Sequence, residues 1–279
     1  MGFPVRQNSG VYQNTFLAIA FILAGGIALL YPTFSGKIVA DTAALSTLPP
    51  WQQANAEPAS DSISISQELR RDLPWRLFLS HSVRSGQSLF WNPLENCGMP
   101  FFALWRTRCL SPFTLPFYFM SFHLASIVSL WLKMTVAGLS AYYAARKFSI
   151  SPLGACFTAL AFECSFALVP HLGTFFSDAV PFLPLTLVAA ECIAVSFPNG
   201  LLLLAFSLAL IMLGGVPELA LLLIFFVTSY ALTRHREGEA ALKRVLDLVP
   251  FLTGTVLLIL GLTAVQILPF MEFFKESAP

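Results

Sequence analysis

Apolar runs separated by short polar stretches are the dominant pattern of this chain. Seven of these runs approach the ~20 residues that a helix needs to cross the hydrocarbon core of a bilayer. They cover residues 16–32, 117–145, 153–170, 180–197, 201–213, 219–232 and 248–270. We therefore predict an all-α integral membrane protein with about seven transmembrane helices.

The fifth and sixth runs are short and meet at residues that break helices. Gly214, Gly215 and Pro217 lie between the two runs, which predicts a tight hairpin at one membrane face. One long bent helix is the alternative, and that helix would have to cross all three residues.

Basic residues in the short connections predict the orientation, because cytoplasmic loops are enriched in lysine and arginine. A cytoplasmic N-terminus places these residues inside: Arg146, Lys147, Arg234, Arg236, Lys243 and Arg244. The first run could instead be a cleaved signal peptide. Arg6 alone is a weak basic leader, however, and the run is long for such a peptide, so we expect a membrane anchor.

This topology makes residues 1–279 a single membrane domain. The first span covers residues 16–32, one large extracytoplasmic loop covers residues 33–115, and six further spans lie within residues 117–270. The chain is thus expected to be multi-pass, with its largest polar segment outside.

The large loop contains one segment with helical periodicity. Trp75, Phe78 and Leu79 fall on one face of residues 74–84, and Pro74 suits the first helical turn. We predict an amphipathic helix there. This helix could lie on the outer leaflet or pack against the loop's own core.

Composition agrees with a membrane location. Hydrophobic residues make up 56% of the chain and charged residues 11%, against roughly 45–50% and ~25% in soluble domains. The formal net charge is +1 and the sequence has no basic cluster, so we do not expect nucleic-acid binding.

Residues of the large loop resemble a known family. Trp91-Asn92-Pro93 followed by Gly98-Met99-Pro100 is similar to the first outer loop of YfhO-like bacterial membrane proteins, which are grouped with the C-fold glycosyltransferases. Other family-like landmarks follow in order: Pro74-Trp75-Arg76, Arg84-Ser85-Gly86, Ala103, Ser111-Pro112, residues 133–147, residues 214–218, residues 266–269 and Glu272. Leu89 and Arg106 depart from the usual Pro and Gln of the family.

The resemblance covers nearly the whole chain and corresponds to the N-terminal half of such proteins, so we expect truncation at the C-terminus relative to the family. It implies a location in the bacterial cytoplasmic (inner) membrane. It also implies sugar transfer on the outer face, from a polyprenyl-phosphate-linked donor to a cell-surface polymer, lipid or protein acceptor.

Such a transfer needs a carboxylate to accept the proton of the acceptor hydroxyl, and cations near the lipid phosphate that leaves. The resemblance best matches Asp61 as the catalytic base, with Asp72 and Asp41 as reserves. An Asx turn or a helix cap in a serine-rich segment is the structural alternative for Asp61.

Substrate-binding candidates are polar or aromatic residues of the outer side. Arg76 or Arg84 is expected to bind the phosphate, although attraction to anionic headgroups is an alternative role for these arginines. Trp91, with Asn92 beside it, could stack on a sugar or pack in the loop. Glu218 could line the site, but a carboxylate also suits a helix start.

No cofactor is expected with certainty, and the sequence contains no zinc-type spacing of Cys and His. A divalent metal is left open, because Asp178 beside His171 in the second outer loop could be a second acid or a metal ligand. Capping of the fourth span by Ser177 and Asp178 is the structural alternative.

A transporter or channel is the rival function, because Lys133, Glu163 and Glu191 fall at membrane depth. A non-catalytic scaffold for envelope assembly is a third reading. We expect Lys133 and Glu163 to pair within the bundle, because an unpaired charge there is costly. Cys97 and Cys109 share the outer loop and could form a disulfide or remain free thiols.

Overall fold

The computed structural model describes residues 9–34, 71–195, 197–233 and 241–277. The regular secondary structure of these residues is helical and includes no β-strand; one isolated antiparallel bridge joins Asn92 and Met99. Asp41 and Asp61 lie outside the described residues, as do Arg70 and most of the loop before it.

In chain order, the described helices are α1 (Ser9–Leu29), α2 (Tyr31–Phe34), α4 (Leu73–Arg84), α5 (Pro116–Phe119), α6 (Phe122–Lys147), α7 (Pro152–Glu163), α8 (Phe176–Ala179), α9 (Leu183–Val195), α10 (Phe197–Leu213), α11 (Pro217–Thr233) and α12 (Ala241–Ser277). Short 3₁₀ turns lie at Trp105–Thr107, Val169–His171 and Val180–Phe182.

A helix occupies each of the seven predicted apolar runs. In the described part, three helical segments are long and apolar enough to cross a bilayer: Phe122–Lys147, Phe176–Ile193 and Val249–Ser277. The other apolar helices are shorter, and the run at 153–170 forms only the 12 residues of α7 before a turn that contains Pro170. The fold therefore indicates a membrane protein, and the count of seven crossings stays a prediction.

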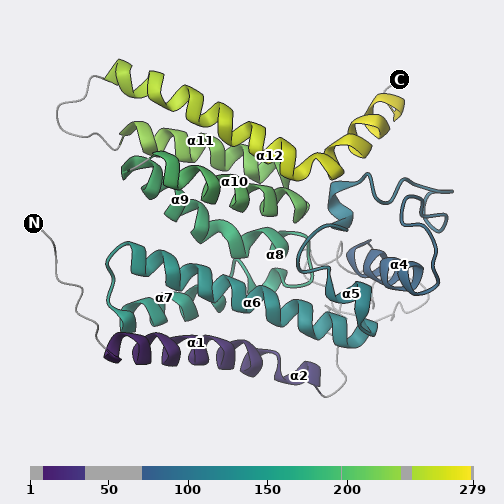
Figure 1. The fold of residues 1–279 in the computed structure, drawn as a ribbon. Helices are drawn as coiled ribbons and strands as arrows, with labels where there is room; N and C mark the ends of the chain where they lie inside the picture. Colours follow the sequence, from purple (N-terminus) through teal and green to yellow (C-terminus); the bar gives the residue numbers. More distant parts are fainter. Residues whose placement is uncertain (1–8, 35–70, 196, 234–240, 278–279) are drawn as a thin grey trace, which may run out of the picture.

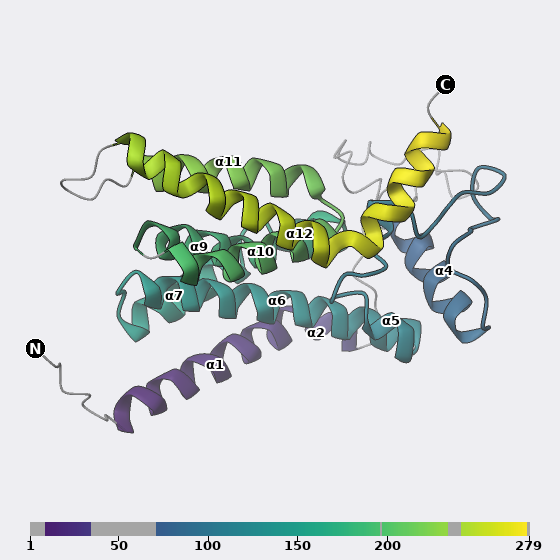
Figure 2. The same cartoon turned by 45° about the horizontal axis from the view of Figure 1, so that its top comes forward.

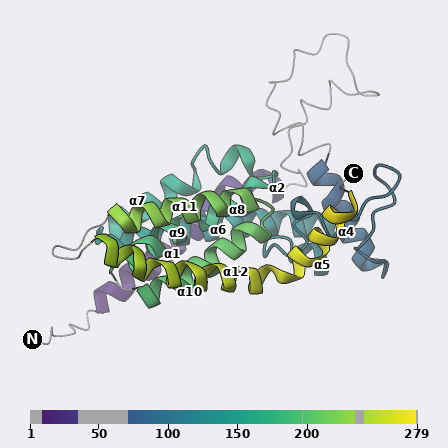
Figure 3. The same ribbon diagram turned by 90° about the horizontal axis from the view of Figure 1, so that it is seen from above.

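The long helices lie alongside one another, as Figure 1 shows. Helix α1 packs on α6 and α7, α6 contacts α9, and α10 contacts α9, α11 and α12. Helix α4 and the loop after it gather at one end of this bundle, and the view from above in Figure 3 agrees. The polar loop is thus presented at a single end.

The predicted hairpin between the fifth and sixth runs is confirmed. Helix α10 ends at Leu213 and α11 begins at Pro217, so the chain reverses within three residues. Gly215 has a φ of 91°, a left-handed conformation that glycine adopts without strain. One long bent helix through this segment is excluded.

Helix α12 is longer than the predicted last span and continues to Ser277. Figures 1 and 2 show its C-terminal part bent away from the line of the rest of the helix, at the end of the bundle where the loop lies. Pro269 lies inside the helix, where proline removes a backbone hydrogen bond and its ring clashes with the preceding turn. The bend brings Phe270 and Phe273 to the loop end of the bundle.

The predicted amphipathic helix at 74–84 is confirmed as α4, at Leu73–Arg84. Its buried side chains Trp75 and Leu79 pack with Phe101 and Phe117. Of the two placements considered, packing against the protein's own loop is the one observed.

Candidate functional site

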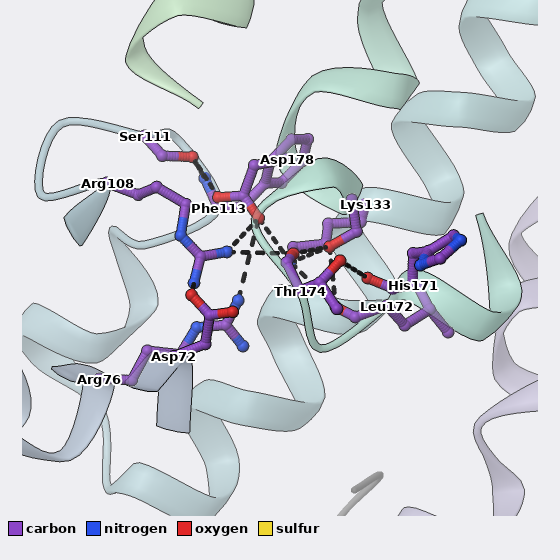
Figure 4. Close-up of polar contacts among 11 residues, drawn as sticks. Asp72, Arg76, Arg108, Ser111, Phe113, Lys133, His171, Leu172, Thr174 and Asp178 are labelled. Carbon is purple, nitrogen blue, oxygen red and sulfur yellow. Dashed lines mark hydrogen bonds and ion pairs between the residues drawn. The ribbon is translucent and has the colours of Figure 1, made fainter. Parts of the chain in front are cut away.

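The residues that connect the loop to the bundle form a buried charge cluster, consisting of Asp72, Arg76, Arg108, Lys133 and Asp178 (Figure 4). One carboxylate oxygen of Asp178 lies 2.6 Å from Lys133 Nζ, 3.2 Å from Arg108 Nη1 and 3.9 Å from Arg76 Nη2. Arg108 Nη2 lies 2.8 Å from Asp72 Oδ1. Two carboxylates are thus shared among three cations.

Hydroxyl and carbonyl groups complete the cluster. Ser111 Oγ donates to Asp178 Oδ2 at 2.7 Å. Lys133 Nζ donates to Ser177 Oγ at 2.7 Å and to the Leu172 carbonyl at 3.2 Å. Buried charges need such partners because each one has left water.

The charge cluster corrects one prediction and bears on the alternatives left open for Asp178. Lys133 was expected to pair with Glu163, and that prediction is wrong, because its partner is Asp178. Asp178 was considered as a second acid, a metal ligand or a cap; its carboxylate is 1% exposed and bound by cations, which favours a structural role. No side-chain group of three His, Cys, Asp or Glu residues lies together in the part of the chain that the structure describes, so the divalent-metal alternative gains no support.

Two predicted site residues belong to the charge cluster. Asp72 is 3% exposed and its pairing with Arg108 leaves little access for an acceptor hydroxyl. Arg76 is directed to Asp178 and also lies 5.7 Å above the ring of Phe117. These contacts indicate that Asp72 and Arg76 hold α4 against the helical bundle.

A cavity of about 480 Å³, which we call the outer cavity, lies at the same end of the bundle. Its wall combines aromatic, cationic and acidic side chains from the loop, the α10–α11 hairpin and the end of α12. The residues are Arg71, Trp75, Glu95, Asn96, Met99, Pro100, Leu104, Trp105, Arg106, Gly215, Pro217, Glu218, Phe270 and Phe273.

Packing between distant segments holds the aromatic wall of the outer cavity. Trp75 Nε1 donates to Glu95 Oε2 at 2.5 Å, which ties α4 to the turn after Trp91. The ring of Trp105 meets the edge of Phe270 at a centroid distance of 6.1 Å. The bend of α12 is therefore part of what closes the cavity.

Arginines frame the cavity through contacts with aromatic rings. Arg71 lies 5.6 Å above the ring of Trp75, and Arg106 lies 4.5 Å above the ring of Phe175. Such contacts orient a guanidinium while leaving its N–H groups able to bind an anion. The cavity thus has cationic groups held at its wall.

The hairpin approaches the loop at a glycine. A Cβ atom at Gly215 would lie 2.9 Å from Arg108 Cγ and 3.1 Å from the Trp105 carbonyl oxygen. Only glycine permits this approach, which places Glu218 of the first turn of α11 at the cavity wall. Glu218 therefore lines the outer cavity, and its role in substrate binding stays a prediction.

A second cavity of about 460 Å³ adjoins the outer cavity and shares Pro100 and Phe273 with it. Trp91 lines this second cavity together with Glu272. A Cβ atom at Gly98 would lie 2.5 Å from Trp91 Cζ2, so the indole ring lies directly on this glycine. Trp91 is 55% exposed and remains accessible to a ligand.

Asn92 and Arg84 have structural contacts. Asn92 is 3% exposed, bonds through its backbone to Met99, and accepts the Leu94 N–H on Oδ1. Arg84, the last residue of α4, donates to the carbonyl of Met120, which directly follows α5. Neither residue lines the outer cavity.

Cys97 and Cys109 are free thiols, so the disulfide alternative is not observed. Cys97 is exposed and Cys109 is 1% exposed. Burial raises the pKa of the Cys109 thiol to about 11, against the opposing hydrogen bond with Thr107. Cys109 is therefore an inert core residue of the loop.

Sequence reasoning missed how these residues combine. Asp178 and Lys133 were each recognised as unusual, but nothing in their spacing shows that they meet. Glu95 and Trp75 were not proposed for binding, and their hydrogen bond depends on the fold of the loop. Arg106, which stands where the YfhO-like family usually has Gln, could have been singled out from the sequence, since it lines the outer cavity.

Comparison with protein-family models, with curated proteins and with solved structures finds no match to this chain. The resemblance to YfhO-like proteins therefore stays a prediction from the sequence.

Proposed function

We propose that this protein is a membrane glycosyltransferase that moves a sugar from a polyprenyl-phosphate-linked donor to a cell-envelope acceptor. The observation that carries the proposal is the outer cavity, which combines arginines, tryptophans and carboxylates at one end of a bundle of apolar helices. In this proposal the bundle crosses the bacterial cytoplasmic membrane seven times, with the N-terminus in the cytoplasm and the cavity outside.

Each part of the donor has a matching surface. Arg71 and Arg106 suit the lipid phosphate, because guanidinium groups bind phosphate oxygens through paired N–H donors. Trp105, which is partly exposed, offers a flat apolar face for a sugar ring, whereas Trp75 is buried beneath Arg71 and supports the cavity wall. Leu268, Met271 and Phe274 are exposed on the stretch of α12 that supplies Phe270 and Phe273 to the cavity, and they suit the polyprenyl chain.

The base remains Asp61 in this proposal, on the family-like placement, and it lies outside the described residues. Asp41, also outside them, is one reserve, and Asp72 is the weaker reserve because of its ion pair with Arg108. Glu218 and Glu95 are the carboxylates of the cavity wall, and Glu218 is the more exposed of the two. A base must reach the acceptor hydroxyl, and among the described carboxylates Glu218 is exposed at the cavity wall.

The transporter alternative has less support. Two of the three residues that suggested it have structural partners: Lys133 pairs with Asp178, and Glu191 accepts a hydrogen bond from the Tyr230 hydroxyl at 2.6 Å. Pathway residues would have to exchange these partners with a solute.

Turnover by the purified chain in nanodiscs tests the proposal. Polyprenyl-phosphate-linked hexoses, supplied one at a time with envelope extract as acceptor, should release polyprenyl phosphate. Loss of a positioned base lowers the rate by about 10²- to 10⁴-fold, so Asp61→Asn should lose nearly all turnover while Asp41→Asn retains it. Wild-type turnover by Asp61→Asn with a loss in Glu218→Gln would move the base to Glu218. Solute flux without sugar release by the wild type would contradict the enzyme.

A further inference from the structure

The side chain of Glu163 occupies an unusual position at the end of α7. Glu163 is 0% exposed, and neither of its carboxyl oxygens has a hydrogen-bond partner among the described residues. Most buried polar atoms are hydrogen-bonded, so an unpaired buried carboxyl group needs an explanation. This position is separate from the charge cluster, since Lys133 pairs with Asp178.

Three glycines make room for the carboxyl group. A Cβ atom at Gly26 would lie 3.2 Å from Glu163 Oε1, and Cβ atoms at Gly25 and Gly138 would each lie 3.4 Å from Oε2. Gly25 and Gly26 belong to α1, and Gly138 belongs to α6. The group is therefore enclosed where three helices meet.

The adjoining face of α6 carries further polar atoms without partners. Trp131, Thr135, Gly138 and Tyr142 follow one another at intervals of four, three and four residues, which places them on one side of the helix. Trp131 Nε1, Thr135 Oγ1 and Tyr142 OH are all buried and lack a hydrogen-bond partner within the described chain. The indole of Trp131 also faces Gly26, at 3.5 Å from the position of its Cβ.

No cation of the packed helices faces Glu163 in the described region. Residues 19–29 of α1 contain no ionisable side chain. On α6 the ionisable groups nearby are Tyr142 and the paired Lys133, and beside Glu163 itself there is Cys164. The other ionisable groups near α7 are Cys156 on the helix itself and His171 in the turn that follows it.

A negative charge enclosed in this way would have neither exposure to bulk solvent nor a counter-charge among the described residues, which is very unfavourable in an apolar interior. A metal cation needs several ligands, and no metal-binding group of His, Cys, Asp or Glu occurs among the described residues. A proton needs only the carboxyl group itself.

We propose that Glu163 is a proton-binding site inside the membrane domain, where the glycines of α1 and α6 enclose a protonated carboxyl group. The ligand is thus a proton, and its release would place an uncompensated charge between α1, α6 and α7. This inference does not depend on the proposed sugar transfer.

A hydrophobic carbodiimide tests for the bound proton in the full chain in nanodiscs. The proton of a carboxylic acid moves to one carbodiimide nitrogen, the carboxylate oxygen bonds to the central carbon, and acyl migration to nitrogen gives a stable adduct of the whole reagent. Mass spectrometry should find the adduct on the peptide with Glu163, and Glu163→Gln should remove it. Glu191, which already accepts a hydrogen bond from Tyr230, is the matched control and should react much less.

Infrared spectroscopy gives a second measurement. The carbonyl band of a protonated carboxylic acid should be present in the wild type and in Glu191→Gln, and it should disappear in Glu163→Gln. An unmodified Glu163 peptide, equal reaction at both residues, or a band unchanged by Glu163→Gln would overturn the proposal. If Glu163→Gln fails to fold, the presence or absence of the carbodiimide adduct on the Glu163 peptide of the wild type still tests the proposal.

Discussion

Single residues in this protein take their roles from partners that are far away in the sequence. Asp178 is the clearest case, because it receives cations from α4, from the loop and from α6. From the sequence, Lys133 and Glu163 were the charges expected to pair, since both fall at membrane depth. The structure separates them, because the side chain of Lys133 reaches α8 while Glu163 meets glycines.

Substitution of either member of the Lys133–Asp178 pair should destabilise the fold. Lys133→Met leaves Asp178 short of one cation and Asp178→Asn leaves Lys133 without its carboxylate, each at a cost of about 3–5 kcal/mol. The double variant should lose less than the sum of the two single losses. Denaturant unfolding in detergent measures this coupling, with Lys147→Met at the opposite end of α6 as control. Strictly additive losses would show that the pair is not coupled.

Gly98→Ala should disturb Trp91 specifically. The φ of Gly98 is 114° and its Cβ would lie 2.5 Å from the indole ring, so alanine strains the turn and displaces the ring. We expect a red-shifted tryptophan emission and a loss of about 1–3 kcal/mol in stability. Gly86→Ala is the control, because Gly86 also has a positive φ, of 69°, but nothing lies within 4 Å of an added Cβ. This variant should strain the backbone without displacing an indole ring. The same emission change in both variants would argue against the contact.

At the scale of elements, the apolar runs located the long helices, and local signals added two further elements. Amphipathic spacing predicted α4, and the glycines and proline at 214–217 predicted the hairpin between α10 and α11. The sequence pattern did not predict the short α7 or the extension of α12 past Pro269, because helix ends depend on tertiary contacts. The outer cavity was not predictable for the same reason: it needs the loop, the hairpin and the bend of α12 together.

The two cysteines of the loop should differ in reactivity. Maleimide should label Cys97, which is exposed, and should leave Cys109 unlabelled at neutral pH because its pKa is about 11 and it is buried. The neutral thiol contributes stability below its ordinary pKa of 9.0, and this contribution is lost as the pH rises toward 11. Mass spectrometry after labelling, with and without denaturant, measures both sites. Equal labelling of the two native thiols, or a disulfide between them, would contradict the structure.

At the scale of the whole molecule, the polar loop and the hairpin lie at one end of the bundle, and α6 ends with Arg146 and Lys147 at the other (Figure 1). The charge rule assigns the basic end to the cytoplasm. An impermeant maleimide on intact cells should therefore label a cysteine-free chain carrying Leu94→Cys, where Leu94 is 82% exposed, and not one carrying Gly238→Cys. The reverse pattern would invert the topology and place the outer cavity inside the cell.

Affinity for polyprenyl monophosphate is the measurement that tests the central claim most directly. The account assigns the lipid phosphate to Arg71 and Arg106 of the outer cavity, and a charged hydrogen bond is worth about 1.5–3 kcal/mol. In nanodiscs, Arg71→Gln and Arg106→Gln should each raise the Kd by roughly 10- to 100-fold. Arg146→Gln, at the opposite end of α6, should leave the Kd unchanged. Equal affinity in all four proteins would contradict a phosphate site in this cavity.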